Sequence, residues 1–513
     1  MSGRFLRNVL HRSVDRVPGA SAVSVAGEEL TYRELWDRAG ALGRRIAHDL
    51  GTPARVGVLT SRTLETYVAY WALVRLGCSI VPLNPSMSAS RLAAALQDAE
   101  VGVLLYTEHH AGLARELGMR CAGLVFEQVD PSTEGAELTY PAARTGEPRN
   151  EAYTIFTSGS TGTPKGVPIT DDNVRSWLPH IVRTYATTEP MRVAQTADIA
   201  WDLSVFNMWL AWSAGGTLVD PGHEVLVKPA SFIAEARLTH WFSTPQSITM
   251  ADLMGDLEPG AMDGLRWSLF GGELLRYDQT RRWMEAASTS RLANVYGPTE
   301  LTCTCFDYIA PRDPAEWLVD QRGVLPVGRP HPAVDYSLMP VDGAANRGEL
   351  VVRGAQRFAG YVASRDNHGA FVRSGTREGW ETVDRPESSD WYRTGDLVEQ
   401  RTDEHGRALL YVVGRTDDQV KIDGHRVEPQ EIEHCARTCV GVDDVAVIAH
   451  SVGAGTELTA FVVGDVQDDA LLTHLRARLP DHMIPARTRR LTVLPQNVNG
   501  KVDRRRLRAE AGS

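Results

Sequence analysis

The feature of this sequence that most constrains its fold is an alternation of short apolar runs with longer amphipathic or apolar stretches. The runs are rich in Val, Ile and Leu, and a helical spacing of apolar residues occupies the segments between them, including 64–77 and 90–100. This alternation predicts an α/β protein in which parallel sheets are covered by helices. The expected strands include 55–60, 78–83, 102–107 and 123–129.

The pattern changes in the last third of the chain. Beyond position 340 we expect a smaller antiparallel region with strands at 348–354 and 409–414. We expect 363–391 to be a long surface loop. From Gly414 a strand–turn–strand, a helix, two strands and a further helix follow, which indicates a small α+β unit of about one hundred residues. The predicted domains are 1–413 and 419–513, and the segment that joins them is 414–418.

Composition excludes several classes of function. The formal net charge is -11 at pH 7, which argues against general affinity for nucleic acid or anionic membranes. Arginines interrupt the apolar residues of 1–17, unlike in a signal peptide, and no apolar run approaches the roughly 18 residues of a membrane span. The six cysteines lack zinc-site spacing and are expected to be buried, reduced thiols. A cytoplasmic protein is the default expectation.

The segment 153–167, YTIFTSGSTGTPKGV, is the strongest local signal for a binding site. It holds three glycines, six hydroxyl side chains between Thr154 and Thr163, and Lys165. Glycines allow several backbone N–H groups to face one anion, hydroxyls add donors, and a lysine adds a positive charge. The loop lacks the Gly-Lys-Ser/Thr ending of a Walker loop. It is therefore interpreted as a phosphate-binding loop and not as a flexible linker.

This loop resembles the signature of the adenylate-forming superfamily, which includes acyl-CoA synthetases, luciferases and the adenylation domains of nonribosomal peptide synthetases. The resemblance covers nearly the whole chain and is closest to the amino-acid-activating branch. The other matching motifs are LTYREL (30–35), LGCSIVPLNP (76–85), WDLSVF (201–206), NVYGPTE (294–300), GELVVRG (348–354), YRTGD (392–396), GRTDDQVKIDGHRVE (414–428) and NGKVD (499–503).

The resemblance implies that the protein uses ATP and Mg²⁺ to convert a carboxylic acid to its acyl-adenylate. It implies that Lys501 and Lys165 are catalytic and that Glu300 binds Mg²⁺. It also implies that Asp417 is a hinge about which a mobile C-terminal domain turns between two poses. One pose would present Lys501, and the other the strand pair 421–426. The expected nucleotide-binding residues are Thr157, Ser158, Gly159, Ser160, Thr161, Gly162, Tyr296 at the adenine, Thr299 at the phosphates, Asp396 at the ribose, and Arg415.

Asp202 distinguishes an amino acid from a fatty or aryl acid, because a buried substrate ammonium needs a counter-charge. The alternative role for Asp202 is a helix cap. The expected pocket contains no charge beyond Asp202 and Lys501, which favours a small or medium apolar or cyclic side chain; a β-amino acid is an alternative. The family's pocket positions fall on Leu203, Phe206, Phe242, Leu269, Gly271, Val295, Cys303 and Thr304.

The expected partner is a separate carrier protein, because the chain ends ten residues after Asp503 with no carrier motif. By resemblance, the phosphopantetheine thiol of that carrier would accept the aminoacyl group in the biosynthesis of a natural product such as an antibiotic. The alternative acceptor is coenzyme A, and the alternative enzyme is an acyl- or aryl-CoA synthetase. A catalytically silent scaffold protein is the alternative that is not an enzyme. The presence of Lys165, Glu300, Asp396 and Lys501 together argues against the scaffold.

Overall fold

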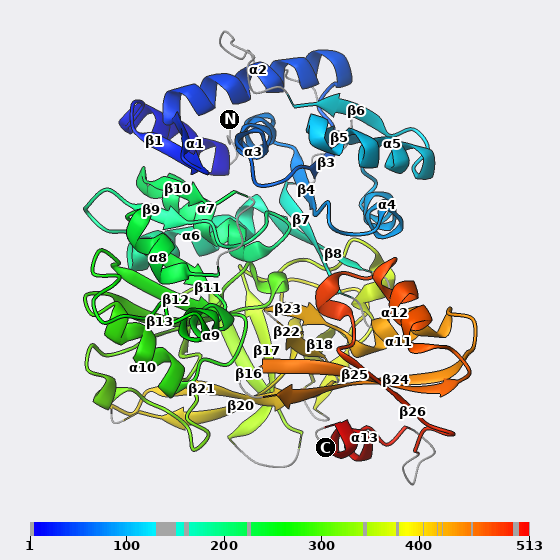
Figure 1. Ribbon diagram of the computed structural model, residues 1–513. Coiled ribbons are helices and arrows are strands. Elements are labelled where there is room, and N and C mark those ends of the chain that lie inside the picture. The colour runs from blue at the N-terminus through cyan, green and yellow to red at the C-terminus, as the bar shows by residue number, and fades with distance from the viewer. Residues whose placement is uncertain are drawn as a thin grey trace.

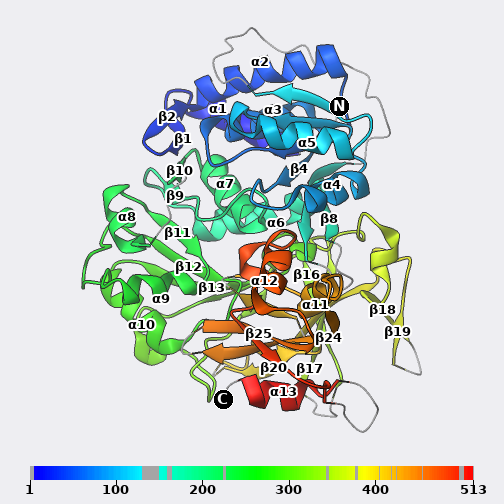
Figure 2. The same ribbon diagram turned by 45° about the vertical axis from the view of Figure 1, so that its right-hand side comes forward.

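The structure is a computed structural model. It describes residues 5–129, 150–158, 164–222, 227–341, 346–375, 379–403, 405–417, 419–422, 424–452, 455–495 and 502–511. Most helices surround two large sheets, and the C-terminal elements α11 to α13 lie together with strands β24 to β26 at one side (Figures 1 and 2). The helices are α1 Phe5–Arg16, α2 Tyr32–Leu50, α3 Leu64–Leu76, α4 Ala89–Asp98, α5 Ala111–Arg120, α6 Asp171–Tyr185, α7 Asp202–Ala214, α8 Pro229–Glu235, α9 Gln246–Leu253, α10 Tyr277–Ala286, α11 Pro429–Arg437, α12 Asp468–Arg476 and α13 Arg504–Ala511.

Two sheets are mainly parallel. The first has the strand order β6-β5-β3-β4-β7-β8, and only its β7–β8 pair is antiparallel. The second has the order β15-β14-β13-β12-β11-β9-β10-β1-β2 and is parallel from β13 to β1. Their strands are β1 Ser21–Val25, β2 Glu28–Thr31, β3 Arg55–Leu59, β4 Ser79–Leu83, β5 Val103–Tyr106, β6 Val125–Gln128, β7 Glu151–Thr157, β8 Lys165–Thr170, β9 Arg192–Ala194, β10 Thr217–Asp220, β11 His240–Ser243, β12 Trp267–Gly271, β13 Arg291–Tyr296, β14 Phe306–Ile309 and β15 Arg329–Pro330.

The remaining sheets are smaller. An antiparallel sheet has the order β16-β17-β20-β18-β19, with β21 paired to β20; β22 and β23 form a hairpin, and β24-β25-β26 a three-stranded sheet. The expected α/β class with a small antiparallel region and an α+β C-terminal part is thereby confirmed. These strands are β16 Val334–Met339, β17 Arg347–Gly354, β18 Phe371–Ser374, β19 Trp380–Thr382, β20 Trp391–Thr402, β21 Ala408–Arg415, β22 Val420–Ile422, β23 His425–Val427, β24 Val442–Val452, β25 Gly455–Gly464 and β26 Arg487–Arg490.

The main core is built around α3 and α7. Both helices are apolar around nearly their whole circumference, as expected of helices that other elements cover on every side. The indole rings of Trp71 and Trp212 are fully buried and meet edge to face at 5.4 Å. This rigid core holds the N-terminus of α7, and therefore Asp202, in a fixed position.

The surface-loop prediction for 363–391 is wrong in part. Within it, β18 and β19 form a hairpin whose first strand pairs with β20. Both strands are short, and β19 and the end of β18 are largely exposed, so they lack the apolar alternation that reveals a strand in sequence.

Two further findings concern the whole chain. All six cysteine side chains are buried and free. Within the described ranges, no helix has the length and apolar character needed to cross a membrane.

Candidate active site

The phosphate-loop segment joins two antiparallel strands at the edge of the first sheet. Thr157 at the end of β7 is paired with Lys165 at the start of β8. The Ser158 hydroxyl donates a hydrogen bond of 2.5 Å to the carbonyl of Arg426, so the C-terminal part of the chain reaches this loop. The Lys165 ammonium lies 5.3 Å from the centre of the Tyr361 ring. The loop therefore starts beside the cationic hairpin β22–β23 and ends beside Tyr361.

Glu300 lies in the short 3-10 turn that follows β13 and is completely buried. Its Oε1 accepts hydrogen bonds from the Tyr361 hydroxyl at 2.7 Å and from Arg426 Nη1 at 2.9 Å. Burial by itself would raise the pKa of Glu300, but Arg426 and Tyr361 outweigh it, and the net shift is downward. Glu300 is therefore held as a carboxylate.

Glu300 also meets the chemical requirement for holding Mg²⁺. Its second oxygen, Oε2, is buried and has no hydrogen-bond partner among the described residues. Mg²⁺ prefers such carboxylate oxygens and completes its shell with water and substrate phosphates. The donor set that the described residues offer thus fits the expected ion.

Tyr296, Asp396, Arg415 and Asp417 form one hydrogen-bonded chain. Asp396 accepts from the Tyr296 hydroxyl at 2.6 Å and from Arg415 Nη1 at 2.6 Å. Arg415 also donates to both carboxylate oxygens of Asp417, at 2.7 and 2.9 Å. Carboxylate oxygens accept more than one hydrogen bond each, so Asp396 keeps capacity for hydroxyl donors. The expected hinge residue is thereby tied directly to the expected ribose-binding residue.

Asp202 lines a cavity of about 170 Å³. It is the first residue of α7; the N-cap is Trp201, which makes no side-chain cap bond. Burial raises the pKa of Asp202 to about 6, and a hydrogen bond with Thr299 opposes that rise. A half-buried carboxylate at the wall of a cavity is an arrangement suited to a cationic ligand group.

Most of the expected pocket residues line the same cavity. Phe206 and Leu269 do not: both are fully buried behind the wall, where Phe206 packs edge to face on Phe242 at 4.7 Å. The expected residues that do line the cavity are Leu203, Phe242, Gly271, Val295, Cys303 and Thr304, together with Ser158, Thr157, Thr299, Asp396 and Arg415.

A second, larger cavity of about 550 Å³ adjoins the first. Tyr296, Asp417 and Glu273 belong to its wall, and Asp396, Arg415 and Lys421 line both cavities. The two cavities are thus neighbouring compartments with mixed polar and apolar walls: a smaller one at Asp202, and a larger one that extends to Tyr296 and Glu273.

The hairpin β22–β23 extends into this region. The amide N–H of Gly424 donates to Glu273 Oε1 at 2.6 Å, and Lys421 lines both cavities. Burial lowers the pKa of Lys421, and the nearby Asp396 opposes that shift. Only glycine fits at position 424, because its φ is +79° and a Cβ there would lie 2.2 Å from Thr244 Cγ2.

Sequence reasoning missed three contacts that hold this arrangement. Arg91 on α4 forms a buried ion pair with Glu431 on α11. The His425 ring stacks on His482 at 3.6 Å and meets Trp201 edge-on at 3.8 Å. No local pattern marks these residues, since each pair joins positions far apart in the chain.

Several expected site residues lie outside the described residues. These are Lys501, Gly159, Ser160, Thr161 and Gly162, and the segment 414–418 is described except for position 418. Their roles therefore stay predictions.

Comparison with known protein families gives two matches. The family described as AMP-binding enzyme matches residues 10–362, and the family described as AMP-binding enzyme C-terminal domain matches residues 431–501. The second match ends at Lys501.

Individual relatives agree with these matches. The chain is 31% identical over 98% of its length to tyrocidine synthase 3 of Brevibacillus parabrevis, but it spans only 8% of that protein. It is 29% identical to an L-proline--[L-prolyl-carrier protein] ligase of Pseudomonas fluorescens, with 98% of each chain covered. The fold is similar to that of the Vibrio cholerae adenylation domain AlmE, solved with glycyl-adenosine-5'-phosphate, at a TM-score of 0.82 and 24% identity over 100% of this chain and 98% of that one.

Proposed function

This chain belongs to the family of AMP-binding enzymes, and from that premise we propose that it activates an amino acid as its aminoacyl-adenylate. In that reaction a carboxylate oxygen of the amino acid bonds to the α-phosphorus of ATP, and the bond from that phosphorus to the pyrophosphate oxygen breaks. The observation that carries the proposal is Asp202, a half-buried carboxylate in the wall of a small cavity that Leu203 and Phe242 also line.

In this proposal the adenosine part of the nucleotide occupies the larger cavity, and its phosphates extend into the smaller cavity, which Ser158 and Thr299 line. Tyr296 flanks the adenine, Asp396 accepts hydrogen bonds from the ribose hydroxyls, and Arg415 lies beside both the ribose and the α-phosphate. The phosphate loop, with Lys165 at its end and Thr299 opposite, holds the phosphates. The proposal is supported by the adjacency of the two cavities, because they share walls at Asp396 and Arg415, next to the Asp202 compartment.

Charge neutralisation is the main chemical demand, since two anions must meet and charge develops on the leaving pyrophosphate. We assign this role to Lys501, with Lys165 at the phosphates. Glu300 would hold Mg²⁺ through its unpartnered Oε2, and the ion would neutralise phosphate charge when bound.

Two poses of the C-terminal unit (419–513) about Asp417 would serve two half-reactions. The pose that presents Lys501 would form the adenylate. The arrangement described above brings the hairpin β22–β23 into the site through Arg426 and Gly424, which favours its assignment to the second half-reaction. There a thiol sulfur bonds to the aminoacyl carbonyl carbon, and AMP leaves with the former carboxylate oxygen.

The amino acid is of small or medium size with an apolar or cyclic side chain, of the proline, valine or 2-aminobutyrate type. The volume of about 170 Å³ and the walls of Leu203, Phe242, Val295 and Cys303 support that range. A β-amino acid, whose ammonium is shifted by one carbon, is the alternative. The expected acceptor is the phosphopantetheine thiol of a separate carrier protein, in keeping with the name of the Pseudomonas fluorescens relative.

A transfer assay tests the proposal. The protein is incubated with ATP, Mg²⁺ and a candidate amino acid, together with either a phosphopantetheinylated carrier protein or coenzyme A. Intact-mass measurement should show the carrier gaining one aminoacyl residue in an ATP-dependent reaction. Acylation of coenzyme A by a fatty or aryl acid, with no aminoacylation of either acceptor, would instead identify an acyl-CoA synthetase.

A further inference from the structure

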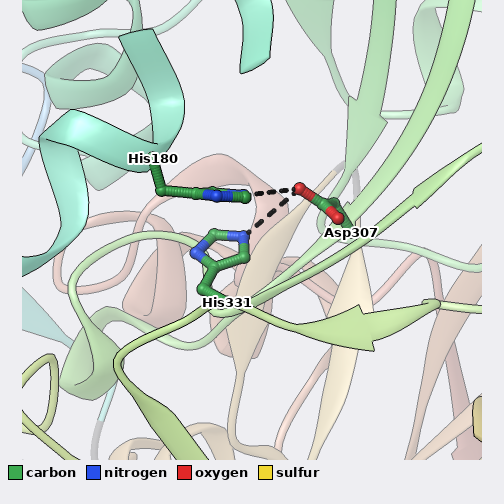
Figure 3. A group of neighbouring side chains, drawn as sticks. All are labelled: His180, Asp307 and His331. Carbon is green, nitrogen blue, oxygen red and sulfur yellow. Dashed lines mark hydrogen bonds and ion pairs between the residues drawn. The ribbon is translucent and has the colours of Figure 1, made fainter. Parts of the chain in front are cut away.

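A cluster of His180, Asp307 and His331 lies apart from both cavities. The three residues come from α6, β14 and the segment after β15, and their side chains point toward one another (Figure 3). His180 Nε2 lies 2.9 Å from Asp307 Oδ2, and His331 Nε2 lies 3.6 Å from the same oxygen. Neither the nucleotide nor the amino acid of the proposed reaction needs these residues, because none of them lines the walls described above.

Two separations between donor atoms, 2.9 and 3.6 Å, are close to those expected around one metal ion. One donor atom from each residue lies within 4.8 Å of the others. Donors bound about 2.0–2.1 Å from a metal are separated by about 2.9 Å at a right angle and about 3.4 Å at the tetrahedral angle. Two imidazole nitrogens with one carboxylate oxygen form a donor set typical of Zn²⁺ and related divalent transition metals, and unlike the all-oxygen sets of Mg²⁺ and Ca²⁺.

His331 provides an independent reason to place a ligand here. Its side chain is 1% exposed, and neither of its ring nitrogens makes a hydrogen bond of normal geometry with a described residue. Buried polar groups are nearly always satisfied, so an imidazole left in this state calls for a partner. Asp307 does not satisfy it, because His331 Nε2 lies 3.6 Å from Asp307 Oδ2, which is too far for a normal hydrogen bond.

The surroundings suit a metal site. His180 and Asp307 are 16% and 15% exposed, which leaves a path for an ion and room for a water ligand. Gln356 lies near His331 but makes no hydrogen bond of normal geometry with it; its amide nitrogen donates instead to the carbonyls of Leu301 and Thr304.

We propose that His180, Asp307 and His331 bind one Zn²⁺ ion, with water in the remaining position. The ion joins α6 to β14 and to the segment that enters β16. The same region supports the wall of the smaller cavity, because the His331 amide donates to the carbonyl of Cys305 at 2.8 Å and Trp177 on α6 donates to Thr304 Oγ1 at 2.9 Å. The site is therefore structural, and it steadies the residues behind Cys303 and Thr304.

The test is the zinc content of the full chain. Wild type and the variants His331→Leu, Asp307→Asn and His180→Gln are loaded with excess Zn²⁺, passed over a desalting column and analysed by elemental mass spectrometry. The matched control is His368→Leu, since His368 pairs with Asp384 at 3.0 Å on the surface but has no third ligand. Circular dichroism confirms that each variant is folded.

Wild type and His368→Leu are expected to retain one zinc per chain, and each ligand variant is expected to lose at least about 90% of it. Removal of an outer partner lowers metal affinity by about 10–100-fold, and removal of a ligand lowers it further. If the ligand variants do not fold, a measurement on wild type alone still tests the proposal. Zn²⁺ should raise the Tm of wild type, and a chelator should reverse the rise. A wild type without retained zinc or without a Tm shift overturns the proposal, as does a folded His331→Leu that keeps its zinc.

Discussion

The substitution Asp202→Asn separates the two roles that the sequence leaves open for this residue. If Asp202 is the counter-charge of a substrate ammonium, its loss leaves that cation unpaired in a buried cavity. Breaking a buried pair by removing one partner costs about 3–5 kcal/mol. The kcat/KM for the amino acid should therefore fall by about 10²- to 10⁴-fold.

The free energy of unfolding of Asp202→Asn should rise, in the opposite direction to its activity. Burial raises the pKa of Asp202 from 3.8 to about 6, so the folded state binds its proton more tightly than the unfolded state does. Above pH 6 the ionised carboxylate then destabilises the fold, by on the order of 3 kcal/mol, and this effect vanishes below pH 3.8. Asp202→Asn should raise the Tm at pH 7.5, whereas loss of a helix cap would lower stability by about 1 kcal/mol.

The assay is amino-acid-dependent pyrophosphate exchange between pH 5 and 8, beside thermal unfolding. In wild type, kcat/KM should fall about tenfold per pH unit below pH 6, because a protonated Asp202 carries no charge. The matched control is Asp198→Asn, which changes a half-buried carboxylate four residues away that lines neither cavity. Activity of Asp202→Asn within threefold of wild type, or a lowered Tm with retained activity, would refute the reasoning.

Three further substitutions probe the two poses and the ion. Lys501→Ala should reduce pyrophosphate exchange by at least about 10²-fold yet leave transfer from supplied aminoacyl-AMP intact; equal loss of both would contradict its assignment to adenylation. Gly424→Ala should impair transfer more than exchange, because its Cβ would lie 2.2 Å from Thr244 Cγ2. Adding Thr244→Ala to the same chain should restore part of the transfer activity. Full transfer activity in Gly424→Ala alone would show that transfer does not need the hairpin. Glu300→Gln should shift the Mg²⁺ titration of exchange to higher concentrations, and an unchanged titration would remove Glu300 from the ion.

Much of the fold could be predicted from apolar patterning, because parallel strands are buried on both faces and leave continuous Val/Ile/Leu runs. The run 102–107 corresponds to β5, and 64–77 to α3, each within a residue or two. The hairpin β18–β19 was missed because short, exposed strands leave no such pattern and depend on pairing with β20.

The site shows the same division between local and long-range information. Motif residues such as Asp202, Glu300 and Asp396 could be identified because their neighbours in sequence mark them. The cluster of His180, Asp307 and His331 could not, because 127 residues separate the first two and no short motif contains all three. Phe206 and Leu269 illustrate another limit, since a motif position does not show whether a side chain lines a cavity or lies behind its wall.

The most direct test of the central claim is pyrophosphate exchange with matched pairs of acids. Each pair holds an amino acid and the same acid without its amino group, such as proline with cyclopentanecarboxylic acid and 2-aminobutyrate with butyrate; β-amino acids and representative fatty and aryl acids complete the panel. The account predicts a strong signal from one small apolar or cyclic amino acid and a signal at least about 10²-fold weaker from its partner. Equal signals within every pair, or activity with fatty or aryl acids alone, would contradict it.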